Sequence, residues 1–258
     1  MRLMKRILSA AAVLALSASL LVGGSSGTAS SVPVSASSAA ESTVSSVEET
    51  ASSAVDENEA AAAQLLNDLT GSYQELWPVI LADEYKQTWL DDCTALVGED
   101  NAEAAFEKLS SMVTGDVYGE DAVKAYANGG GAYFCGFTNS LAILTFDGET
   151  STISGTDKDG NVLFSHTYHY IGMEPVRGLY EFQSDDADSG EFTYFFLAPD
   201  TSAETYHIEF RYGSDAEALS QYDTGEYAYW LASGISTDCD QTMIDNCIEL
   251  FCTENLAG

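Results

Sequence analysis

The sequence predicts an α+β fold in which helices at both ends flank an antiparallel sheet rolled into a barrel. Helical patterns fill residues 59–128 and return near the C-terminus. Six short strands with hairpin spacing lie between them, and the apolar period changes from helical to twofold after the glycines at 129–131. Helices grouped before and after a run of strands are typical of α+β rather than α/β proteins.

Helical segments are expected wherever strong helix formers or an apolar stripe are bounded by glycine or proline. In the third of the four segments before the sheet, Phe106 and Leu109 lie on one stripe. Glycines 129–131 end the fourth. The expected helices are 59–69, 73–93 with a break at Pro78, 101–113 and 119–127, then 214–222 and 239–251 after the sheet.

Strands are expected where apolar and polar residues alternate between turn signals. Asp147-Gly148 and Asp159-Gly160 are tight-turn signals that join the first three strands as hairpins. Consecutive hairpins of this kind favour a closed antiparallel barrel. The expected strands are 140–146, 151–156, 162–173, 178–183, 191–198 and 204–212.

Residues 1–29 have the order of a bacterial-type secretory signal peptide. Basic residues in the first six positions precede an apolar run at 7–22, which is short for a stable membrane span. The surrounding pattern resembles a lipoprotein signal, but Gly24 occupies the place of the lipidated cysteine. We therefore expect a secreted or extracytoplasmic protein without stable membrane insertion, with an uncleaved anchor as the alternative.

Two further regions follow the signal. Residues 30–59 are rich in serine and alanine and have no aromatic residue, so they predict a disordered tether. Residues 60–258 are expected to form one domain of ordinary size.

The strongly acidic composition limits the classes of partner. Three of the nine basic residues lie in the signal, so the rest of the chain has 41 acids and 6 bases, a net charge of −35. Such a chain is repelled by phosphate backbones, which argues against nucleic-acid binding. Solubility outside the cell and attraction of cations are both consistent with this charge.

The three histidines are the first candidates for chemistry. On a strand, His207 shares one face with Thr205, Glu209 and Arg211. It is either a metal ligand or a hydrogen-bonded histidine of the sheet. His166 and His169 are three residues apart and should point to opposite faces, so they would share an ion only across a bulge.

No catalytic motif is evident, so we expect a non-catalytic protein. The chain has neither a GxSxG elbow nor an HExxH helix. A couple between Cys135 and His166 is supported only by residue type. The five cysteines form no CxxC pair, and their odd number leaves at least one unpaired within the chain. The run at 185–188 reads as a solvated acidic turn.

Several segments together resemble one family. Residues 66–80 combine Gly71, Tyr73 and Trp77-Pro78, and residues 191–219 contain an apolar segment ending in Ala-Pro followed by a strand with His207. This pattern resembles the ZinT-type domains, also called YodA-type, over roughly residues 65–258.

The resemblance implies a lipocalin-like, or calycin, barrel with added helices that binds zinc outside the cytoplasm, often for a zinc uptake transporter. The three zinc-binding histidines of the family correspond to Phe195, Thr205 and His207, so only His207 is retained. Because zinc sites need three or four ligands, Glu204, Glu209 or Cys135 would have to complete a changed site, with His166 and His169 as more distant candidates.

Two functions remain open on these grounds. The first is an exported ZinT-like protein that binds a divalent metal ion, zinc, with a partly substituted site. The second is a lipocalin-like module with a degenerate metal site that binds a small molecule or a surface partner.

Overall fold

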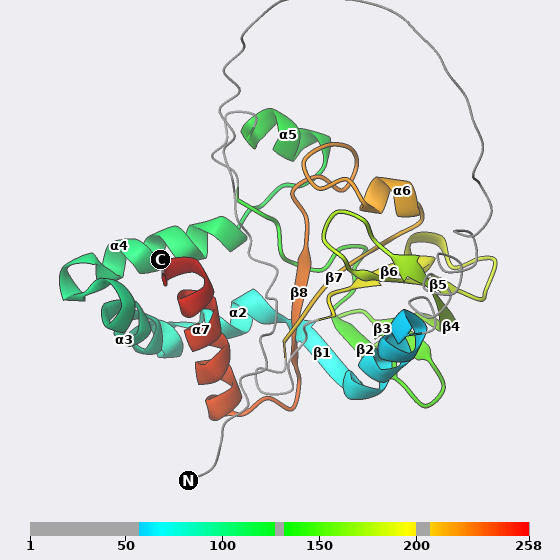
Figure 1. Cartoon of the computed structure of the whole chain (residues 1–258), viewed down its shortest axis with the longest axis horizontal. Coiled ribbons are helices and arrows are strands. Elements are labelled where there is room, and N and C mark those ends of the chain that lie inside the picture. Colours follow the sequence, from blue (N-terminus) through cyan, green and yellow to red (C-terminus); the bar gives the residue numbers. More distant parts are fainter. Residues whose placement is uncertain (1–56, 127–131, 200–206, 258) are drawn as a thin grey trace, which may run out of the picture.

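A closed barrel and a group of helices beside it make up the computed structural model, which describes residues 57–126, 132–199 and 207–257 (Figure 1). The expected signal peptide, and the expected tether up to residue 56, lie outside this range, as do Glu204 and Thr205. Residues 57–59, at the end of the expected tether, belong to a helical segment at 57–68. No helix in the described ranges is long and apolar enough to cross a lipid bilayer.

The barrel is a meander in which each strand pairs antiparallel with the next, and β8 pairs with β1 to close it. The closing register places Tyr73 opposite Ser236 and Glu75 opposite Gly234. The strands are β1 (Gly71–Glu75), β2 (Ile143–Asp147), β3 (Thr152–Thr156), β4 (Val162–Met173), β5 (Tyr180–Ser184), β6 (Tyr194–Leu197), β7 (His207–Gly213) and β8 (Ala232–Ser236). The expected α+β barrel is confirmed.

The two strands that close the barrel were not expected from the sequence. Residues 73–93 were expected to be helical, but β1 occupies Gly71–Glu75 before the helices begin. Apart from Ile235, β8 consists of small residues and lacks a clear alternation, and at Gly234 two close contacts leave little room for a side chain. A Cβ atom on Gly234 would lie 3.1 Å from Ile208 and 3.3 Å from Phe137.

α2, α3, α4 and α7 form a group on one side of the barrel, where α2 contacts β8, whereas α5 and α6 lie elsewhere (Figure 1). The helices are α2 (Leu76–Ile80), α3 (Lys86–Val97), α4 (Glu99–Val113), α5 (Glu120–Tyr126), α6 (Ala216–Leu219) and α7 (Gln241–Leu256), with 3-10 turns η1 (Asp83–Tyr85) and η2 (Gly190–Phe192). The expected helix at 214–222 is thus much shorter, and the expected strand at 191–198 begins as η2.

The helical layer has its own apolar core against the outer wall of the barrel. Trp89 is fully buried there, and its indole N–H donates to the Ile80 carbonyl at 2.7 Å. Leu231 and Ile235, the latter on β8, belong to the same cluster, so the helices cover this part of the wall.

The barrel interior is filled by aromatic rings. Phe195 is fully buried at its centre, with ring centroids 5.4 Å from Tyr168 and Tyr212 and 5.8 Å from Phe164. An eight-stranded barrel is just wide enough for side chains to fill it. The apolar side of the 57–68 helix joins this cluster through Leu65 and Leu66.

Arg211 fastens a loop to the outside of β7. It is fully buried, and its guanidinium donates to the carbonyls of Leu219, Gln221 and Tyr227. Its Cζ atom lies 4.3 Å from the centroid of the Tyr222 ring. Burial lowers the pKa of Arg211 to about 10, so the side chain stays protonated at neutral pH.

Cys93 and Cys252 are expected to form a disulfide when the chain folds under oxidising conditions. Both are fully buried, and their sulfur atoms lie 3.9 Å apart between α3 and α7. A bridge closing a loop of this length would stabilise the protein by up to about 5 kcal/mol. The protein is refolded in a glutathione redox buffer. Peptide mapping then identifies the pairing of the cysteines, and urea unfolding measures the gain in stability. A different pairing, or equal stability of the oxidised protein and Cys93→Ser, would contradict this prediction.

Asp92→Asn is expected to stabilise the protein at neutral pH. Desolvation, followed by repulsion from Glu249 on α7, raises the pKa of Asp92. The folded state therefore binds this proton more tightly than the unfolded state, and the charge of Asp92 reduces stability as pH rises through the raised pKa.

We expect a gain of about 0.5–1 kcal/mol at pH 7, the size typical of surface-charge changes. The gain should vanish below about pH 3, where aspartate is largely protonated in both states. Urea unfolding over this pH range measures it, with the exposed neighbour variant Asp91→Asn as the control. A gain that is unchanged at low pH would show that charge is not its cause.

Candidate functional site

His207 and Glu209 share the outer face of β7. The residues between and after them, Ile208 and Phe210, belong to the interior cluster, so the alternation of the strand directs His207 and Glu209 outward. This agrees with the arrangement expected for 207–211. Both are half-buried, and their Cα atoms are about 7 Å apart along the strand. They can therefore contribute one nitrogen and one carboxylate ligand from the same side of the wall.

The neighbours of this face come from β8 and the helical layer. His207 pairs with Ile235, and Glu209 pairs with Ser233, which is buried. Burial, and then the nearby charge of Glu209, raises the pKa of the Cys247 thiol to about 12. The same two causes raise the pKa of Cys135. Both thiols are thus neutral at physiological pH when no metal ion is bound.

Phe195 lies far from this pair. It is on β6 opposite Tyr212, inside the barrel, whereas His207 is five residues from Tyr212 along β7 and faces outward. Five residues of strand span about 16 Å. The structure therefore does not bring together positions 195 and 207, two of the three positions to which the resemblance assigns the zinc-binding histidines.

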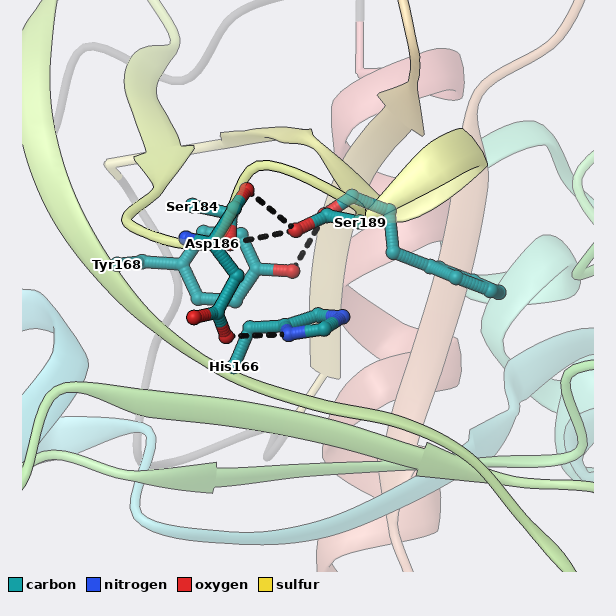
Figure 2. Close-up of polar contacts among 6 residues, drawn as sticks. His166, Tyr168, Ser184, Asp186 and Ser189 are labelled. Atoms are coloured by element: carbon teal, nitrogen blue, oxygen red, sulfur yellow. Dashed lines mark hydrogen bonds and ion pairs between the residues drawn. The ribbon is translucent and has the colours of Figure 1, made fainter.

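His166 faces the barrel interior near one end, where it contacts an acidic turn. Its Nδ1 lies 2.7 Å from the Asp186 carboxylate, and its ring stacks at 6.0 Å from that of Phe164. Figure 2 shows this pair beside Ser184 and Ser189, whose hydroxyls are 2.7 Å apart. Because an ionised carboxylate only accepts hydrogen bonds, Nδ1 carries the proton and Nε2 is left with its lone pair in the neutral ring.

His169 makes the equivalent contact on the other face of β4. Its Nδ1 lies 2.6 Å from the Asp185 carboxylate, and the side chain is half exposed. The two histidines thus point to opposite faces, as expected, and each has its own aspartate. The acidic run at 185–188, expected to be a solvated turn, provides both partners. Local sequence patterns do not predict these pairs, because they join residues 16 and 20 positions apart.

No group of three or more histidine, cysteine, aspartate or glutamate residues in the described part of the chain is arranged to hold a metal ion. Glu204 and Thr205 are outside that part. Among the expected ligands in the described ranges, His207 and Glu209 share the outer face of β7, and a site built on them needs at least one more donor.

Comparisons with known proteins give structural but no sequence relatives. No family model and no curated protein sequence matches this chain. The Zn(II)-bound ZinT-like domain of AdcA from Streptococcus pneumoniae is similar in structure, with 15% identity and a TM-score of 0.45 over 71% of this chain and 89% of that domain. The Zn(II)-bound AdcA of the same organism gives 17% identity and a TM-score of 0.42 over 72% of this chain and 35% of that one.

Proposed function

We propose that this chain is an exported protein that binds a divalent metal ion, zinc, through His207 and Glu209. The observation that carries the proposal is the placement of these two donors on one half-buried face of β7. Imidazole nitrogen and carboxylate oxygen are common zinc ligands. The sequence resemblance to ZinT-type domains, whose best section includes His207, supports the same choice of metal.

Glu204 is our candidate for the third ligand. It precedes His207 by three residues, so its Cα lies within about 11 Å of that of His207 even in an extended chain. A carboxylate there, with a water molecule as fourth ligand, would complete a tetrahedral site. With two oxygen donors and one nitrogen, the site would hold zinc less tightly than three histidines and would admit harder cations more readily.

Export and charge fit this role. The N-terminal signal, without a cysteine at residue 24, would release the protein outside the cytoplasm. A net charge near −35 raises the local concentration of cations around the molecule. We propose that the protein collects zinc in that compartment and serves a zinc uptake transporter.

Zinc titration by calorimetry tests the site. The parent protein should bind one zinc ion with a dissociation constant in the micromolar range or tighter. His207→Ala should weaken binding at least tenfold, since a lost ligand leaves too few donors. Glu209→Gln and Glu204→Gln should each weaken it several-fold.

His169→Ala is the matched control, because it removes a histidine on β4 that has its own aspartate partner. It should leave zinc binding unchanged. Melting temperatures of all variants report whether they fold. Absence of micromolar binding by the parent, or equal binding by the parent and a folded His207→Ala, would refute the site.

A further inference from the structure

A cleft of about 350 Å³ opens where the end of β1 meets α2, the end of α4 and residues 134–136. Its walls are mostly apolar and include Trp77, Leu81, Val113 and Phe134. The volume is within the range of sites for small organic ligands. Cys135 lines it too, and the charge of Glu209 helps to raise the pKa of that thiol, so the cleft lies near the outer face of β7 that holds His207 and Glu209.

Glu75 is the one charged residue among the described residues that line this cleft. Its Oε1 accepts a hydrogen bond from the Phe137 backbone N–H at 2.6 Å. Its Oε2 receives no hydrogen bond from the described residues and is not among the buried polar atoms without a partner, so it is open to solvent. The carboxylate is therefore held in place through one oxygen while the other is available.

Gly136 allows this arrangement. A Cβ atom at that position would lie 2.9 Å from both Glu75 Oε1 and the Phe134 ring. Only glycine therefore allows the Glu75 carboxylate and the Phe134 ring to come this close to the backbone of residue 136. The segment is fixed by further hydrogen bonds. Trp230 donates its indole N–H to the Gly136 carbonyl at 2.9 Å, and the Ser233 N–H donates to the Cys135 carbonyl at 3.0 Å. The cleft is thus preformed, which lowers the entropic cost of binding.

Among the residues that the structure describes, no lysine or arginine lines this cleft to pair with the charge of Glu75. The sequence contains neither residue between Arg6 and Lys86. The tether expected at 30–59 therefore has no cationic side chain to place there. An ionised carboxylate beside aromatic and aliphatic walls favours a cation with an apolar body, because the charge pairs with Glu75 and aromatic faces attract cations.

We infer that this cleft binds a small organic ammonium ion, a protonated amine on an aromatic or aliphatic body, with the ammonium group on Glu75 Oε2. The wall formed by Trp77 and Phe134 takes the apolar body. The inference does not require that zinc binds to His207 and Glu209, and it gives a place to the small-molecule function left open by the sequence.

Calorimetric titration of the full chain, in EDTA to remove metals, tests the inference with three ligands of similar shape. 2-Phenylethylammonium should bind with a submillimolar dissociation constant. The neutral 2-phenylethanol and the anionic 3-phenylpropionate should bind at least tenfold more weakly. Glu75→Gln should weaken binding of the amine at least tenfold while leaving that of the alcohol unchanged, since glutamine still accepts from Phe137 N–H.

Two variants complete the test. Thr114→Trp, which places a large side chain at the wall of the cleft, should weaken binding of the amine and the alcohol alike, and Glu149→Gln, on an exposed turn, should change neither. Absence of amine binding at millimolar concentration, equal binding of the three ligands, or unchanged amine binding by a folded Glu75→Gln would overturn the inference. Because EDTA is present throughout, none of these outcomes depends on whether the zinc site exists.

Discussion

The packing of aromatic rings inside the barrel determines where this protein can bind anything. Phe195 lies at the centre, with Phe210 and Tyr212 of β7 stacked near it. Each of these rings is fully buried. Because an eight-stranded barrel has little space beyond its own side chains, this filling leaves the outer wall and the ends of the barrel for ligands. The candidate ligands His207 and Glu209 lie on the outer wall, and His166 lies near one end of the barrel.

The outer wall is divided by what covers it. Toward the N-terminal end of β7 the helical layer approaches β8, and His207 and Glu209 lie half-buried beside it. Toward the other end of the strand, Arg211 is buried under the 219–227 loop, and its two terminal nitrogens donate to backbone carbonyls of that loop. The same strand therefore has a structural cation at one end and a pair of candidate metal ligands at the other.

Local patterns in the sequence predict the hairpins from β2 to β7, the opposite directions of His166 and His169, and the shared face of His207 and Glu209, because alternation along a strand fixes each of them. The strands that close the barrel, β1 and β8, cannot be predicted in this way. In β1 only Tyr73 is buried, and in β8 the close contacts of Gly234 with Ile208 and Phe137 leave little room for a side chain. The pairs of His166 with Asp186 and of Glu75 with Phe137 are also invisible, because they depend on how distant strands meet. The motif of the family assigns two of its zinc-binding histidines to Phe195 and His207. In the structure these two positions lie on different faces of the barrel wall.

The central claim is that the outer face of β7 holds the metal. Anomalous diffraction at the zinc absorption edge, from crystals grown with one equivalent of zinc, locates the ion directly. We predict a single strong peak within about 2.1 Å of a His207 ring nitrogen, with a carboxylate oxygen of Glu209 as a second ligand. A peak at His166 or His169, or no peak at full zinc loading, would contradict the assignment.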